Sequence, residues 1–159
     1  MKQLYLDCDG VLADFDGGFE AQFGVTPRAY EASHGSRAFW RDIRTKAPRF
    51  YLFLPLLPDA RALYEAVRHL KPTILTGCPG GGWAEAQKVA WAGVHFPDVP
   101  MITCAAREKR RYCRPGDVLV DDREKYRGLW EEAGGTFVLH RSAAASIPQV
   151  LAAFEDEPA

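Results

Sequence analysis

Five short apolar runs constrain the fold of this chain more than any other feature of its sequence. Each run is bounded by glycine, proline or aspartate, which is typical of buried parallel strands. Stretches with helical periodicity separate the runs, so the sequence predicts a doubly wound α/β domain with a parallel sheet. The predicted strands are Gln3–Asp7, Thr73–Thr76, Val99–Thr103, Asp117–Asp121 and Gly135–Leu139.

Helices and one long insertion are expected around these strands. Helical patterns cover residues 59–70, 82–94 and 122–134, with Asp59 as the N-cap of the first and Gly134 as the C-cap of the last. Residues 15–58 contain no clear strand but many aromatic residues, and we interpret them as a small helical cap inserted after the first strand. The core domain would then comprise residues 1–14 and 59–159, with a frayed tail after Ala153.

The composition excludes several classes of protein. A chain of 159 residues is large enough for one domain with its own core. The formal net charge of -1 provides no basic field for a nucleic-acid polymer, and no apolar run reaches the length of a membrane span. The 4 cysteines form no C-x-x-C pair, which argues against a zinc site, and no signal peptide is expected. We therefore expect a cytoplasmic protein, monomeric or homodimeric, with reduced thiols.

Polar side chains follow the predicted strands at the edge where parallel sheets bind their ligands. Asp7 and Asp9 follow the first strand, Thr76 ends the second, and Asp121 and Asp122 end the fourth. Carboxylates gathered at one edge repel one another unless a cation lies among them, and Mg²⁺ prefers oxygen ligands of this kind. The alternative is that the first two acids form a turn and the last two cap a helix starting at residue 123. The matched positions at strand ends favour a magnesium site.

The motifs at these positions resemble those of a known superfamily. Residues 7–15, DCDGVLADF, resemble the D-x-D-G motif of the haloacid dehalogenase-like phosphohydrolases, and TILTG (73–77) and VLVDD (118–122) resemble their second and fourth motifs. Within that superfamily the chain is most similar to the 5'(3')-deoxyribonucleotidases, which also carry a segment like residues 47–67. The resemblance extends from residue 4 to about residue 138. It implies a phosphatase with a core of this fold and a small cap.

The resemblance also implies roles for the acidic residues. Asp7 would be the nucleophile that becomes an aspartyl-phosphate, and Asp9 would protonate the leaving oxygen and then activate water. Mg²⁺ would be held by Asp7, by the backbone carbonyl of Asp9 and by the pair Asp121 and Asp122, with Asp122 favoured as the direct ligand. Asp14 would be either a cap at the start of the insertion or a further catalytic acid.

The phosphate would be bound by the Thr76 hydroxyl, by the backbone N–H groups of Gly77 and Cys78, and by a lysine. Lys109 matches the place of the lysine in the third motif of the superfamily. Lys88 is the second candidate, because the deoxyribonucleotidases carry a basic residue there as well.

The resemblance implies a small phosphorylated substrate, most simply a 5'-(deoxy)nucleotide. Aromatic side chains of the insertion could stack on its base. The candidates are Phe15, Phe39, Trp40, Phe50 and Tyr51. Two departures from the family concern the substrate side: a glycine at position 77, where the animal enzymes have serine, and a shorter cap. A sugar phosphate or other small metabolite is therefore an alternative substrate, and a non-catalytic binding module is the alternative to an enzyme.

Overall fold

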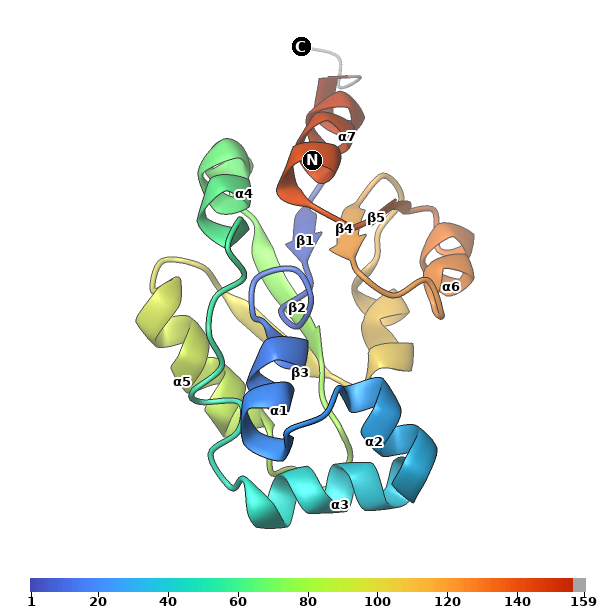
Figure 1. Cartoon of the computed structure of the whole chain (residues 1–159). Coiled ribbons are helices and arrows are strands. Elements are labelled where there is room, and N and C mark those ends of the chain that lie inside the picture. Colours follow the sequence, from blue (N-terminus) through green and yellow to red (C-terminus); the bar gives the residue numbers. More distant parts are fainter. Residues whose placement is uncertain (156–159) are drawn as a thin grey trace.

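Five parallel strands form one sheet in the order β3-β2-β1-β4-β5 (Figure 1). In the computed structural model, which describes residues 1–155, each strand overlaps one of the predicted runs. The strands are β1 (Leu4–Leu6), β2 (Thr73–Gly77), β3 (Met101–Cys104), β4 (Val118–Asp121) and β5 (Thr136–Leu139). The doubly wound α/β fold predicted from the sequence is confirmed.

Alternate residues of the strands face opposite sides of the sheet, and apolar side chains cover both sides. Leu4 and Leu6 pack into the larger core cluster. Tyr5, which lies between them, packs into a smaller cluster with Trp130. Burial on both faces explains why the strands read as continuous apolar runs in the sequence.

Helices lie on both sides of the sheet. The larger cluster includes residues of α4, α5 and α7, and the smaller one includes a residue of α6. The helices of this part are α4 (Ala60–Val67), the 3₁₀ helix η1 (Arg68–Leu70), α5 (Glu85–His95), the 3₁₀ helix η2 (Ala106–Tyr112), α6 (Arg127–Glu132) and α7 (Ala143–Glu155). None of the helices within residues 1–155 is long and apolar enough to cross a membrane.

Three details differ from the sequence prediction. The helix α6 begins at Arg127 rather than at residue 122, so the acidic pair before it does not cap a helix starting at residue 123. The side chain of Asp59 does not cap its own helix; its Oδ2 accepts a hydrogen bond from the backbone N–H of Ala143, where α7 begins (2.6 Å). The helix α7 continues to Glu155, so fraying after Ala153 is wrong for residues 154–155, and residues 156–159 lie outside the described part.

The inserted segment forms three helices at the carboxyl end of the sheet (Figure 1). They are α1 (Phe15–Phe23), α2 (Pro27–His34) and α3 (Ser36–Lys46). The segment leaves and returns through neighbouring stretches, because the N–H of Asp14 donates to the Pro55 carbonyl (2.8 Å) and that of Leu57 to the Leu12 carbonyl (2.9 Å). Asp14 caps α1 by accepting a hydrogen bond from the N–H of Gly17 (2.9 Å), which is the structural one of its two expected roles.

Aromatic rings fill the interior of the cap. Phe19 is 0% exposed. Its ring centroid lies 4.4 Å from that of Phe23 and 5.1 Å from that of Phe39. Phe53, by contrast, is 69% exposed. The cap is therefore held together by its own aromatic core.

Phe19→Ala should lower the free energy of unfolding by about 3–5 kcal/mol, because it removes a fully buried ring and leaves a cavity among its neighbours. Urea unfolding followed by circular dichroism measures the change. Phe53→Ala is the matched control and should change stability by no more than about 0.5 kcal/mol. Equal losses in the two variants would contradict this account of the cap.

Candidate active site

The chain turns sharply after β1, and the carboxylate of Asp122 lies against this turn. Asp7 still belongs to the sheet, because its backbone N–H donates to the carbonyl of Val120 in β4 (2.9 Å). The turn passes through Gly10, whose φ is 81°. A Cβ at this position would lie 2.0 Å from Oδ2 of Asp122. Glycine is therefore required here both for the left-handed backbone and for the space that the Asp122 carboxylate occupies.

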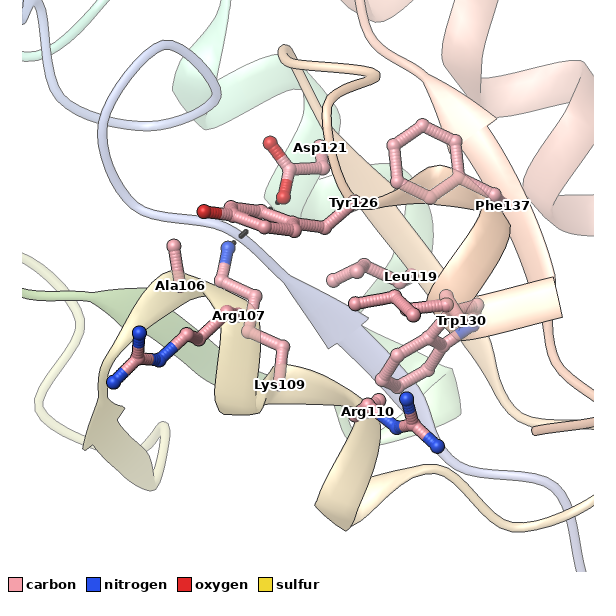
Figure 2. A pocket seen from close by; sticks show the side chains of 10 residues that line it. Ala106, Arg107, Lys109, Arg110, Leu119, Asp121, Tyr126, Trp130 and Phe137 are labelled. Atoms are coloured by element: carbon pink, nitrogen blue, oxygen red, sulfur yellow. Dashed lines mark hydrogen bonds and ion pairs between the residues drawn. The ribbon is translucent and has the colours of Figure 1, made fainter. Parts of the chain in front are cut away.

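Lys109 lies between two carboxylates. Its side chain is buried, and Nζ donates to Oδ1 of Asp7 (3.1 Å) and to Oδ2 of Asp121 (2.9 Å). Figure 2 shows Lys109 and Asp121 pointing towards each other beside the ring of Tyr126, while Arg107 points away. The cavity drawn there has a volume of about 10 Å³, which is room for a single water molecule rather than a substrate.

Lys88 provides a second buried ammonium group. It lies on α5 and is 2% exposed. Its Nζ donates to Oδ2 of Asp9 (2.7 Å), to Oγ1 of Thr76 (2.9 Å) and to the carbonyl of Gly77 (2.9 Å). The Nζ also lies 4.6 Å from the ring centroid of Tyr51. Lys88 thus connects the loop after β1 to the end of β2 and to the cap.

The structure places both lysines beside carboxylates, whereas the sequence analysis treated them as alternatives for one position. Part of the signal for Lys88 was present in the sequence: its spacing indicates a buried lysine, although not which acid it meets. It lies three and four residues before Trp91 and Ala92, on the buried face of α5. A lysine on the buried face of a helix requires an anionic partner, and Asp9 is that partner.

The two acids after β1 have different protonation equilibria. Burial alone would raise the pKa of Asp7, but the ammonium groups of Lys109 and Lys88 outweigh burial and hold this pKa below its ordinary value. Burial raises the pKa of Asp9 above its ordinary value, although Lys88 opposes the shift. Oδ1 of Asp9 is buried and has no hydrogen-bond partner among the described residues. The same site therefore shifts the pKa values of its two neighbouring acids in opposite directions.

Three carboxylates could hold a metal ion. Oxygen atoms of Asp7, Asp121 and Asp122 lie within 4.8 Å of one another. Burial and the charges of Asp7 and Asp121 raise the pKa of Asp122 to about 8. Burial and the charge of Asp7 raise the pKa of Asp121 to about 6, against the effect of Lys109. A cation among these oxygens would relieve the repulsion that raises both values.

The charge balance of the whole network fits a divalent cation. With Asp9 included, four carboxylates surround two ammonium groups, which leaves two negative charges uncompensated when all are ionised. Asp121 is already bonded to Lys109 and to the backbone N–H of Arg123 (3.1 Å). Asp122 is therefore favoured as a direct ligand. Oδ2 of Asp9 is bound to Lys88, and a role of the Asp9 backbone carbonyl as a metal ligand stays a prediction.

The residues expected to bind phosphate lie beside this network. Thr76 is fully buried, and its hydroxyl oxygen accepts the hydrogen bond from Nζ of Lys88. Gly77 lies where η2 crosses the end of β2, and a Cβ there would be 2.9 Å from Cβ of Ala106. The expected role of the Cys78 N–H in binding an anion is wrong, because this group donates to the carbonyl of Cys104 in the neighbouring strand (2.7 Å). The roles of Thr76, Gly77 and Lys109 in phosphate binding stay predictions.

The five aromatic candidates are divided between the cap interior and its edge. Four are buried, and Trp40 is half-buried with its ring centroid 6.2 Å from that of Phe15. The buried ones are Phe15, Phe39, Phe50 and Tyr51. Tyr51 is the candidate that contacts the lysine network. Trp83, which the sequence analysis did not select, lies beside it with a centroid distance of 5.5 Å.

A divalent cation should stabilise the protein more at pH 8 than at pH 6. The raised pKa of Asp122, about 8, means that the folded protein holds a proton that the unfolded chain has lost. This contribution to stability is fully present below the ordinary carboxyl pKa and is lost as the pH rises through about 8. A cation replaces that proton, so the increase in Tm on adding MgCl₂ should grow from pH 6 to pH 8.

Thermal unfolding with MgCl₂ or with EDTA measures this difference. Asp122→Asn should remove most of the increase, whereas Asp98→Asn, at an exposed position, should keep it. An increase in Tm that is the same at both pH values, or that survives in Asp122→Asn, would contradict the assignment.

Comparisons with known proteins point to one fold. No protein-family model matches the chain, and none of the curated proteins does. Among solved structures, a hydrolase from Streptococcus pneumoniae TIGR4 is 16% identical with a TM-score of 0.52, and the match covers 96% of this chain and 100% of that one. L-2-haloacid dehalogenase from Xanthobacter autotrophicus is 13% identical with a TM-score of 0.56, over 86% of this chain and 76% of that one.

A structure of the same dehalogenase with chloropropionic acid covalently bound is 14% identical, with a TM-score of 0.54, over 99% of this chain and 85% of that one. Identities this low carry no information on substrate. The structural matches show that the chain has the α/β fold of the haloacid dehalogenases.

Proposed function

We propose that this protein is a Mg²⁺-dependent phosphomonoesterase of the haloacid dehalogenase-like superfamily, with Asp7 as its nucleophile. The observation that carries the proposal is the pairing of each acid after β1 with its own buried lysine. Lys109 holds Asp7 and Lys88 holds Asp9, and the two carboxylates have pKa values shifted in opposite directions. A nucleophilic carboxylate beside a carboxyl group whose pKa is raised is the pair that a two-step phosphoryl transfer needs.

In the first step, a carboxylate oxygen of Asp7 forms a bond to phosphorus. The bond between phosphorus and the leaving oxygen breaks, and its electron pair stays on that oxygen. Asp9 gives the leaving oxygen its proton, and its unpartnered Oδ1 is the atom suited to do so. In the second step Asp9 takes a proton from water and the water oxygen bonds to phosphorus. The bond between phosphorus and the Asp7 oxygen breaks, its electron pair returns to the Asp7 carboxylate, and orthophosphate leaves.

The lysines keep these groups in place during both steps. Lys88 binds Oδ2 of Asp9 and so directs the other oxygen towards the substrate. Lys109 binds Oδ1 of Asp7 and keeps this carboxylate ionised. A bound Mg²⁺, held by Asp7, Asp122 and the backbone carbonyl of Asp9, would neutralise charge on the phosphate oxygens.

Phosphoryl transfer is favoured over the reaction named for the similar dehalogenases. Mg²⁺ is usually held in proteins by one or two carboxylates together with oxygens of a substrate phosphate, whereas a haloacid offers no phosphate. A phosphate together with a divalent cation instead suits the acidic group of Asp7, Asp121 and Asp122. The complete set of acids and lysines also argues against a non-catalytic binding module.

A 5'-(deoxy)nucleotide is the substrate that we propose, because aromatic rings lie next to the network. Tyr51 lies over Lys88, and Trp83 lies against Tyr51. A sugar phosphate is the second candidate. It is favoured by the burial of four of the five aromatic candidates, which leaves Trp40 as the accessible ring among them.

Asp7→Asn should abolish both the hydrolysis of p-nitrophenyl phosphate and the formation of a phosphoenzyme, because it removes the nucleophile. Asp9→Asn should lower kcat by about 10²–10⁴-fold, the usual contribution of general acid–base catalysis, yet still allow a phosphoenzyme to be trapped by acid quench. EDTA should abolish turnover of the unmodified protein. Asp16→Asn, at an exposed position on α1, is the control and should keep kcat unchanged. Full turnover by Asp7→Asn would refute the mechanism.

Trp40→Ala should raise KM for thymidine 5'-monophosphate about tenfold while changing KM for p-nitrophenyl phosphate much less. Base stacking on an aromatic ring contributes about 1–3 kcal/mol in nucleic-acid binding proteins. Phe39→Ala is the comparison, because it removes the neighbouring buried ring and should lower Tm and reduce activity on both substrates alike. If Trp40→Ala affects the two substrates equally, the sugar-phosphate alternative is preferred.

A further inference from the structure

The cap contains a cavity of about 250 Å³ that the proposed reaction does not use. It lies between α1 and the chain that follows α3, a segment that Figure 1 shows running from α3 towards α4. Phe50 and Leu54, which are almost fully buried, contribute to its lining. Phe53 also lines it and is 69% exposed. The cavity therefore has a solvent-exposed aromatic ring at its edge and buried apolar side chains in its wall.

The charged side chains that line this cavity are both cationic. They are Lys46 and Arg49. Lys46 lies 3.8 Å from Oδ2 of Asp42, but that carboxylate also accepts a short hydrogen bond from the hydroxyl of Tyr30 and pairs with Arg41. Arg49 has no ion-pair partner among the described residues. The cavity therefore combines apolar walls with uncompensated positive charge.

We propose that this cavity is a binding site for a small organic anion with a flat, apolar body. The anionic group would lie between Arg49 and Lys46, where it would form charge-assisted hydrogen bonds. The apolar body would lie against Phe50 and Phe53, which would remove the exposed ring from water. The volume of about 250 Å³ is slightly below the usual range for ligand pockets, roughly 300–1,000 Å³, so the site suits a molecule of two or three rings.

This site shares Phe50 with the five aromatic candidates but is separate from the charged network of the candidate active site. Its lining contains none of the acids and lysines of the buried network. The proposal is therefore independent of the phosphatase activity, and binding at the cavity can be measured without turnover.

The test uses two fluorescent probes that share one apolar body. 8-Anilinonaphthalene-1-sulfonate carries a negative charge, whereas N-phenyl-1-naphthylamine is the uncharged counterpart. The native full chain should bind the sulfonate at one saturable site, at least about tenfold more tightly than the neutral probe, the ratio that corresponds to about 1.4 kcal/mol. Saturating MgCl₂ with orthophosphate should not displace it.

Two variants and two matched controls locate the binding. Arg49→Gln and Phe53→Ala should each weaken binding of the sulfonate at least about tenfold, a change of about 1.4 kcal/mol, without lowering Tm. Arg37→Gln, an exposed arginine on α3, and Val94→Ala, 73% exposed on α5, should leave it unchanged. Equal affinity for the two probes, displacement by orthophosphate, or unchanged binding in Arg49→Gln would each overturn the proposal.

Discussion

The pairing of two buried lysines with the acids after β1 is the interaction on which the rest of this site depends. Isolated charges in a protein interior are destabilising by several kcal/mol, and removing one partner of a buried pair typically costs about 3–5 kcal/mol. Here Lys88 and Lys109 are both almost fully buried, and each donates to at least two oxygen atoms. The two ammonium groups offset part of the carboxylate charge and hold the pKa of Asp7 below its ordinary value. The charge that remains suits a divalent cation.

The fold brings these groups together from distant parts of the chain. Asp7 extends β1, Asp121 ends the adjacent strand β4, and Lys88 reaches in from α5. The carboxyl ends of parallel strands lie at the same edge of the sheet. The cap lies at that edge and is held together by its own aromatic core. Glycine at position 10 keeps a Cβ out of the space taken by Asp122. The fold therefore places the charged groups close enough to one another for the lysines to offset the carboxylates.

Much of this could be predicted from the sequence, because strand ends and short motifs are local features. The strands were found by their apolar runs, and the acids at positions 7, 121 and 122 by their place directly after them. The separate role of Lys88 could not be derived from spacing alone, since it depends on which face of α5 meets the loop after β1. The same holds for the Cys78 N–H, whose partner belongs to a strand that starts more than twenty residues later. The burial of four of the five aromatic candidates could not be predicted either. The number of aromatic residues in a segment does not show which rings are buried and which are accessible.

A crystal structure of the protein with Mg²⁺ and beryllium trifluoride would test the central claim most directly, because this anion mimics a phosphoryl group on a carboxylate. The account predicts beryllium bonded to a carboxylate oxygen of Asp7, a metal ion in contact with Asp7 and Asp122, and the hydrogen bonds of Lys88 and Lys109 preserved. Beryllium trifluoride bound elsewhere, or a metal ion held away from these acids at saturating concentration, would contradict it.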